Sequence, residues 1–334
     1  MGRHVNIPVF IPHLGCPNQC VFCNQRSISG VMEFCPGDFS KTVEEALSTV
    51  ESDALCEIAF FGGSFTGIDR TLMTELLSRA RSYVESGRVK SIRCSTRPDY
   101  IDAEIIKILK EYGVDTVELG LQSSSDRVLG LSKRGHSFSD EVKACRMLTE
   151  AGITLVGQMM IGLPGSTLNE ELETARFILS SGASAVRIYP TVVFRDTELC
   201  EMTERGEYTP LSLEEAVYRS AEVLKLFIEK DITVLRIGLC ASENLRGEET
   251  YLAGPNHSAL GELIEGEVYY GLLRDLIIKK GEKTDNITVF APKGSTSKLL
   301  GHRGVNKRRL EKEFGIRRIT VKEDEMLSNY RIRI

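Results

Sequence analysis

Three cysteines close together near the N-terminus are the residues best suited to chemistry in this sequence. Cys16, Cys20 and Cys23 have the spacing C-x-x-x-C-x-x-C and directly follow an apolar run. Thiolates hold iron–sulfur clusters, and a four-iron cluster held by only three of them keeps one iron open to a further ligand. Zinc binds at similar spacings, and His13 or Cys35 would then complete its four ligands. The spacing alone leaves both metal centres open.

Short apolar runs that alternate with helical segments would position these cysteines. Six runs are predicted strands: Val5–Ile11, Glu57–Phe61, Ser91–Cys94, Thr116–Leu121, Thr154–Met160 and Ala185–Tyr189. Between them lie stretches with helical spacing, several of them ended by a glycine: Thr42–Ser52, Arg70–Ser86, Ala103–Glu111, Ser139–Ala151 and Asn169–Ser180. This alternation predicts an α/β fold with a parallel sheet, either an open doubly wound sheet or a partial barrel. In both folds the active-site residues lie at the carboxyl ends of the strands.

The second predicted strand ends in a pair of glycines, Gly62 and Gly63. Glycines let backbone N–H and C=O groups approach a ligand closely. A lone glycine pair is usually only a turn. Its place after the strand that follows the cysteines makes it a candidate part of the same site.

The C-terminal part of the chain has a different order of elements and its own charge. We predict three parts, 1–200 for the barrel, 201–280 for its extension and 286–334 for a small α+β unit, with a linker at 281–286. The last part is predicted as strand, helix, G-x-x-G turn, helix and strand. Between Lys293 and Lys322 ten basic residues stand against two acidic ones, Glu311 and Glu313.

Composition excludes several classes of protein. With 334 residues, 42% of them hydrophobic and 27% charged, the chain is globular rather than disordered or fibrous. No run approaches the ~20 apolar residues of a membrane span, and the N-terminal run does not resemble a signal peptide, so we expect a cytoplasmic protein without membrane contact. The net charge of −5 gives no overall signal for nucleic acid. Nine cysteines argue against a disulfide framework, and the six outside the triad are expected to be small buried residues: Cys35, Cys56, Cys94, Cys145, Cys200 and Cys240.

The cysteine spacing, with Phe22 directly before the last cysteine, and the glycine pair together resemble the radical S-adenosylmethionine (SAM) superfamily. Over roughly residues 5–270 the chain is also similar to the radical SAM domain of the Elongator catalytic subunit and its bacterial relatives, in these segments: Ser95–Tyr100, Glu118–Ser123, Lys133–Ser137, Gly162–Thr167, Ile188–Thr191 and Arg195–Thr197. The resemblance implies a partial (β/α)6 barrel, a [4Fe-4S] cluster and SAM, which an electron from the cluster cleaves to a 5′-deoxyadenosyl radical. It disfavours zinc. Elongator's subunit continues into an acetyltransferase domain, for which no length remains here, so acetyl-CoA chemistry is not expected.

The resemblance also assigns ligand residues. Cys16, Cys20 and Cys23 would hold the cluster. The methionine end of SAM would lie against Gly62, Gly63, Ser64 and Thr66, and candidates for its ribose and carboxylate are Ser95, Gln122 and Gln158. An anionic group of SAM or substrate could bind the guanidinium forks of Arg97, Arg134 and Arg187. For each polar residue outside the two main motifs, a structural hydrogen bond or ion pair explains it equally well, and no catalytic acid, base or radical relay is assigned.

The C-terminal unit resembles a minimal KH fold, whose G-x-x-G loop grips the backbone of about four nucleotides. Two glycines allow close approach, and the following helix N-terminus offers N–H donors to a phosphate. The residues expected to contact RNA are Gly301, His302, Arg303, Gly304, Lys307 and Arg308.

Three functions follow from these resemblances. The first is a radical SAM enzyme that modifies RNA, most specifically tRNA with a wobble uridine as candidate target, served by an electron donor such as ferredoxin or flavodoxin. The second is a radical SAM enzyme for a small molecule, as in the coproporphyrinogen oxidase branch, with the C-terminal unit as an oligomerisation or lid element. The third is a non-catalytic RNA-binding protein stabilised by zinc or a cluster.

Overall fold

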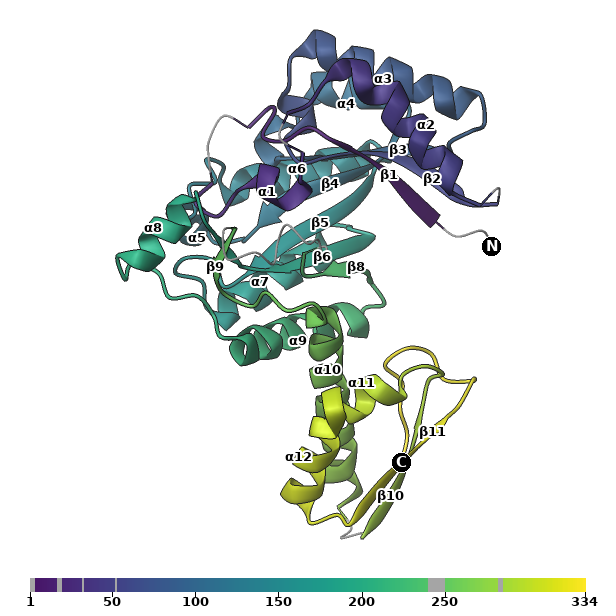
Figure 1. The fold of residues 1–334 in the computed structure, drawn as a ribbon, viewed down its shortest axis with the longest axis vertical. Coiled ribbons are helices and arrows are strands. Elements are labelled where there is room, and N and C mark those ends of the chain that lie inside the picture. Colours follow the sequence, from purple (N-terminus) through teal and green to yellow (C-terminus); the bar gives the residue numbers. More distant parts are fainter. Residues whose placement is uncertain (1–3, 17–19, 32, 52, 240–249, 282–284) are drawn as a thin grey trace.

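The strands of the larger part form one parallel sheet. In the computed structural model, which describes residues 4–16, 20–31, 33–51, 53–239, 250–281 and 285–334, seven strands pair in the order β1-β2-β3-β4-β5-β6-β8. Their bounds are β1 His4–Phe10, β2 Leu55–Phe61, β3 Ser91–Thr96, β4 Val114–Gln122, β5 Thr154–Ile161, β6 Ala185–Pro190 and β8 Thr233–Ile237. Every neighbouring pair is parallel. The sheet curls into a half-barrel (Figure 1), and the predicted α/β partial barrel is confirmed.

The seventh strand is the main addition to the predicted fold. The sequence places Thr233–Ile237 in the extension 201–280, whereas in the structure β8 pairs with β6, from Ala185↔Thr233 to Ile188↔Ile237. The helix α9 (Leu213–Glu229) leads the chain back for this parallel pairing. The partners are far apart in the sequence, and a local pattern carries no information on such a pairing.

Helices line the outside of the sheet (Figure 1). They are α2 Phe39–Thr49, α3 Arg70–Glu85, α4 Ala103–Glu111, α6 Phe138–Glu150, α7 Leu168–Ser180 and α9. Ser137 and Thr167 begin α6 and α7 with capping boxes, because each hydroxyl accepts from the backbone N–H three residues on and the acidic side chain there accepts in return. Shorter elements follow strands: α1 Gln25–Ser29, α5 Asp126–Leu131, α8 Glu198–Glu204, and the antiparallel pair β7 Val193–Phe194 and β9 Tyr251–Ala253. No helix in the described ranges combines the length and the apolar character that crossing a membrane requires.

One long helix, α10 (Leu260–Lys280), belongs to two hydrophobic cores. Its first turns place Ile264 and Val268 in the barrel's core, and its later turns place Leu273 and Ile277 in a second core. The second core is completed by β10 Asn286–Ala291, α11 Thr296–Leu300, α12 Val305–Phe314 and β11 Arg318–Glu323. Figure 1 shows α10 leading from the barrel into this C-terminal unit.

The C-terminal unit has the predicted order of strand, helix, turn, helix and strand. β10 and β11 are parallel, with Ile287 opposite Ile319. The last strand that the sequence predicts, at 330–334, is reduced to a single bridge between Phe290 and Arg333. The division into parts at 200, 280 and 286 stays a prediction, and α10 joins the last two of them through its shared packing.

Candidate active site

The loop that follows β1 and carries Cys16, here called the cysteine loop, is hydrogen-bonded to the glycine pair at the carboxyl ends of β1 and β2. The Ile11 N–H donates to the Phe61 carbonyl (2.7 Å) and the His13 N–H to the Gly62 carbonyl (2.9 Å), while the Ser64 N–H donates back to the Leu14 carbonyl (2.9 Å). A Cβ on Gly63 would lie 2.6 Å from the Ile11 carbonyl oxygen and closer still to that of Leu14. Gly63 is therefore required by the close approach of the loop itself.

The three cysteine sulfurs lie among polar partners. Cys16 Sγ is 3.3 Å from Ser64 Oγ, and Arg134 Nη1 donates to Cys20 Sγ over 3.2 Å. Burial, and to a smaller extent the charges of Cys20 and Cys16, raise the pKa of Cys23 to about 12. Three neighbouring thiolates would repel one another, and the positive charge of a bound metal centre would offset this repulsion and favour their deprotonated forms.

The donor set was compared with the two metal centres that the spacing allows. In the described part of the chain, no three Cys, His, Asp or Glu side chains are grouped to hold a single metal ion. Cysteines on a four-iron cluster bind different irons, so their sulfurs need not meet at one point. His13 Nε2 accepts the Gln25 N–H (3.1 Å), which disfavours this nitrogen as a zinc ligand. The residues fit a cluster held by thiolates, and the assignment of Cys16, Cys20 and Cys23 as its ligands stays a prediction.

Three buried polar atoms after β3, at the end of β4 and in the loop before α6 have no hydrogen-bond partner among the described residues. They are Arg97 Nη1, Gln122 Oε1 and Arg134 Nε, on side chains of residues that are 8% exposed or less. Gln122 also has a positive φ of 70° at the end of β4, where the pairing with β5 shifts register. Buried polar groups normally have hydrogen-bond partners, and strained backbone tends to occur at functional sites. These atoms fit a polar ligand beside the cysteines.

Two predicted ligand residues are instead bonded inside the barrel. Arg187 donates to both carboxylate oxygens of Glu118 (2.7 and 2.9 Å), and Gln158 Nε2 donates to one of them (2.8 Å). Arg93 joins Glu118 to Glu57, so the polar network reaches from β6 to β2. Burial alone would raise the pKa of Glu118, but these hydrogen bonds outweigh it and hold that pKa below its usual value. These hydrogen bonds favour a structural role for Gln158 and Arg187 over a role in binding SAM or substrate.

The remaining predicted SAM residues have mixed surroundings. The Ser64 hydroxyl meets Cys16, and Thr66 Oγ1 lies 2.6 Å from Thr96 Oγ1 and donates to the Tyr100 carbonyl (2.9 Å). Both hydroxyls thus already have protein partners. Ser95 is half-buried on β3, in register with Glu118. Their part in binding SAM stays a prediction.

The sequence reasoning did not assign a role to three residues near Arg97: His136 and Glu141, which are buried, and Asp99, whose side chain is 25% exposed. Asp99 accepts both hydrogen bonds from one edge of Arg97, and His136 and Glu141 lie within the same group. Asp99 and His136 lie within the segments Ser95–Tyr100 and Lys133–Ser137 that resemble the Elongator family, but nothing in the sequence marks either of them, or Glu141, as functional.

The G-x-x-G turn is built as the sequence suggests. Gly301 and Gly304 have φ of 74° and 75°, and Arg303 between them has φ of 52°, a region that side chains rarely adopt. Asn306 fixes the turn to the barrel side of α10 by donating to the Gly266 carbonyl (2.8 Å). His302 and Arg303 are exposed. The turn therefore presents a basic surface at the cost of backbone strain.

Two candidate RNA contacts next to the turn are partly engaged within the protein. Lys307 lies 3.8 Å from Glu311, and Arg308 Nη1 donates to the Arg303 carbonyl (2.8 Å). Contact of the six turn residues with RNA stays a prediction.

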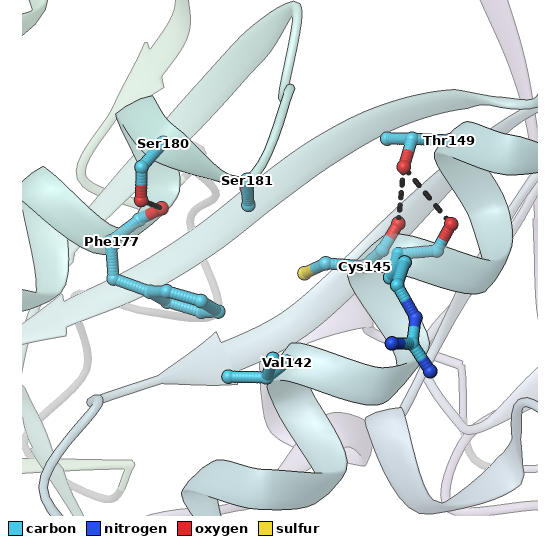
Figure 2. A pocket seen from close by; sticks show the side chains of 7 residues that line it. Val142, Cys145, Thr149, Phe177, Ser180 and Ser181 are labelled. Carbon is cyan, nitrogen blue, oxygen red and sulfur yellow. Dashed lines mark hydrogen bonds between the residues drawn. The ribbon is translucent and has the colours of Figure 1, made fainter.

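A hollow of about 430 Å³ lies between α6 and α7 and contains none of the predicted site residues. Figure 2 shows Cys145 and Phe177 among the seven side chains that line it, with the Thr149 hydroxyl bonded to the Cys145 and Arg146 carbonyls. Burial raises the pKa of the Cys145 thiol to about 12, so it is no nucleophile. The other cysteines agree with expectation at Cys56, Cys94, Cys145 and Cys200, which are buried, whereas Cys35 is exposed and Cys240 lies outside the described residues.

The geometry defines a half-barrel protein that can hold a thiolate-bound cofactor at the carboxyl ends of its strands. A sequence model of the Radical SAM superfamily matches residues 10–178, and one of the Radical_SAM C-terminal domain matches residues 183–270. The first match covers half of the chain, which therefore belongs to the radical SAM superfamily, whose members use a [4Fe-4S] cluster and SAM.

Known relatives place the chain near Elongator-type proteins. It is 32% identical over 217 residues to an uncharacterized protein of Methanocaldococcus jannaschii, covering 61% of this chain and 66% of the relative. It is 37% identical over 133 residues to the tRNA uridine(34) acetyltransferase of Methanocaldococcus infernus, covering 39% of this chain and only 25% of the relative. The structure of the archaeal Methanocaldococcus infernus Elp3 matches 84% of this chain and 64% of that chain, with a TM-score of 0.60 and 24% identity, and so supports the fold. The chain thus spans less than two thirds of the length of each of these relatives.

Proposed function

We propose that this protein is a radical SAM enzyme that modifies RNA, with tRNA as the substrate class and a wobble uridine as candidate target. The proposal of an enzyme rests on buried polar atoms of Arg97, Gln122 and Arg134 that have no hydrogen-bond partner among the described residues, and on the contact of Arg134 with Cys20. The RNA reading is supported by the strained basic turn and by relatives named for acting on tRNA uridine 34.

Residues of this chain have separable tasks in the proposal. Cys16, Cys20 and Cys23 hold the cluster, and Arg134 donates a hydrogen bond to the sulfur of Cys20. When bound, a [4Fe-4S] cluster and SAM would supply radical chemistry, given an electron from a donor such as ferredoxin or flavodoxin. The backbone at Gly62 and Gly63 lies against the methionine end, and the Arg97 Nη1–H binds an anionic group. The barrel excludes water from these contacts.

The enzyme part is tested by anaerobic reconstitution with iron and sulfide, followed by an assay for 5′-deoxyadenosine from SAM with dithionite as reductant. We expect Cys20→Ser to lose most of the 5′-deoxyadenosine and part of the iron. Cys145→Ala is the matched control, because this buried cysteine lies on α6 outside the site, and it should keep both. Zinc in place of iron, with no cleavage of SAM by the wild type, would end the enzyme proposal.

The RNA part is tested by tRNA binding as a function of salt. Arg303→Gly relieves a positive φ, so we expect it to raise the free energy of unfolding by about 1 kcal/mol. If Arg303 contacts a phosphate, the same variant weakens binding and lowers the slope of log K against log salt by about 1. Arg317→Ala is the control, since Arg317 is exposed, carries the same charge and lies beyond the other end of α12.

Three outcomes contradict the RNA part. Equal effects of the Arg303 and Arg317 substitutions on tRNA binding would show that the G-x-x-G turn is not the RNA contact. No tRNA affinity of the wild type at low salt would favour a small-molecule substrate instead. The substrate itself is tested by comparing, by mass, the nucleosides of bulk tRNA from cells with and without the gene, and an unchanged profile would contradict tRNA modification.

A further inference from the structure

A buried histidine lies behind the candidate anion-binding arginine. The segment Lys133–Ser137, between α5 and α6, places His136 with a side chain that is 0% exposed. Its Nε2 is 3.0 Å from Oε1 of Glu141, a residue in the first turn of α6 whose side chain is also 0% exposed. His136 Nδ1 has no hydrogen-bond partner among the described residues. The histidine therefore has one nitrogen engaged and one available.

The available nitrogen faces the carboxylate that orients Arg97. His136 Nδ1 is 3.9 Å from Asp99 Oδ1, which is beyond hydrogen-bond length and close enough for an electrostatic interaction. Asp99 accepts from Arg97 Nε and Nη2, both at 2.9 Å, so it fixes the plane of the guanidinium group. Arg97 Nη1, on the opposite side, is buried and unpartnered.

Electrostatics decides which nitrogen of His136 carries the proton. Burial lowers the pKa of His136 to about 3, helped by the charge of Arg134 and Arg97 and opposed by that of Asp99 and Asp140. Burial raises the pKa of Glu141 well above its usual value. These shifts favour the neutral forms of both partners, for which two arrangements of the hydrogen bond are possible. If Nε2 donated to Glu141, the lone pair of Nδ1 would face the Asp99 carboxylate, so the favoured form has Glu141 donating to Nε2 and the proton on Nδ1.

Packing alone does not explain this group. Arg97 Nη1, His136 Nδ1 and Glu141 Oε2 are all buried without partners. Each such atom destabilises the folded state because it has lost its hydrogen bonds to water, whereas apolar side chains of similar size would not. Burial lowers the pKa of Arg97, but the hydrogen bonds and charge of Asp99 and the charges of Cys20 and Cys16 raise it, so the guanidinium group lies within electrostatic range of these cysteines.

We propose that His136 is a positioning residue: its Nδ1–H, set by Glu141, orients Asp99, which in turn presents Arg97 Nη1 to a carboxylate group of the ligand beside the cysteines. This inference rests on the proposed function, in which Arg97 binds an anionic group, and takes that group to be the carboxylate of SAM. Glu141 and His136 act through Asp99 and do not touch the ligand.

A pair of substitutions separates positioning from packing. The side-chain amide nitrogen of asparagine can take the place of Nδ1, and that of glutamine the place of Nε2. His136→Asn therefore keeps a donor toward Asp99 and loses the contact with Glu141, whereas His136→Gln does the opposite. We expect the dissociation constant of SAM, measured by equilibrium dialysis on the reconstituted protein, to rise about 10- to 100-fold in His136→Gln, the usual effect of removing such a supporting partner. It should change less than threefold in His136→Asn, with the iron content unchanged in both.

The opposite order would overturn the inference, because glutamine fills the space of histidine better than asparagine and a packing role makes His136→Asn the worse variant. Equal affinity of His136→Gln and wild type would also overturn it while the proposed function stands. A reconstituted wild type that neither binds nor cleaves SAM would instead refute the proposed function.

The tautomer gives a readout that needs no cofactor. Imidazole 15N spectra of the apo protein, with the signal of His136 identified among the five histidines by the asparagine variant, should show a neutral ring protonated on Nδ1. A ring protonated on Nε2, or on both nitrogens at pH 7, would contradict the inference.

Discussion

Replacing Gly63 by alanine tests whether the glycine pair serves the cysteine loop. The added Cβ would lie 2.6 Å from the Ile11 carbonyl oxygen and nearer still to that of Leu14. These atoms are backbone, so the loop must move as a whole. Two hydrogen bonds cross this contact, His13 N–H to Gly62 O and Ser64 N–H to Leu14 O, each 2.9 Å long.

The expected cost follows from these contacts. Losing both hydrogen bonds costs about 2 kcal/mol, and overpacking of this kind costs about 1–3 kcal/mol. Because the two effects share one displacement, we expect Gly63→Ala to lower the free energy of unfolding by about 2–3 kcal/mol. The displaced loop carries Cys16, so the iron bound after reconstitution should fall as well.

The assay combines urea denaturation of the apo protein with iron analysis after anaerobic reconstitution. Gly130→Ala is the matched control, since Gly130 lies in α5 with no atom within 4 Å of the added Cβ. It should be neutral or stabilising by up to about 1 kcal/mol. Wild-type stability and iron content in Gly63→Ala would refute the idea that this glycine positions the loop.

Three further predictions concern stability. Glu118→Gln leaves Arg93 and Arg187 buried with weaker partners and should cost about 3–5 kcal/mol by denaturant unfolding, and a loss under 1 kcal/mol would contradict the importance of this network. His136 has a folded pKa of about 3 and binds its proton more readily in the unfolded chain, so the folded state loses stability as pH falls below about 6.5. Glu141 has a raised pKa and binds its proton more readily in the folded chain, so the folded state gains stability as pH falls toward about 4.5. Glu141→Gln should therefore lose up to about 1.4 kcal/mol per pH unit relative to wild type on acidification from pH 6.5 to 4.5, and parallel pH profiles would contradict the pairing. Asn306→Ala removes the bond to the Gly266 carbonyl and should cost about 1–2 kcal/mol, while an unchanged midpoint would show that the turn is held by other contacts.

Local patterns were sufficient for most elements of the barrel. The helix predicted at Ala103–Glu111 has the same bounds in the structure, because Asp102 caps its start and its apolar residues recur at helical spacing. The strand predicted at Thr154–Met160 is longer by one residue for a similar reason, since a buried parallel strand is a continuous apolar run. β8 could not be assigned to the sheet in this way, because its pairing with β6 depends on a long-range contact.

The candidate site was less accessible to sequence reasoning. The cysteine loop and the glycine pair are contiguous motifs, and the structure brings them together. Arg187 and Glu118, in contrast, are 69 residues apart and meet only through the curl of the sheet. A polar residue at a strand end looks the same in the sequence whether it faces a ligand or a neighbouring carboxylate.

The shared helix α10 has a consequence for the entropy of binding. Asn306 fixes the basic turn at the level of Gly266, six residues after Leu260 begins the helix, which is about 9 Å along its axis. A module on a flexible tether must search for its second contact, and the ordering of the tether reduces the gain from having two sites. Here the helix has already removed that freedom during folding. A ligand that touches both the turn and the barrel meets a single preorganised surface, and its length must match a fixed spacing rather than an average one.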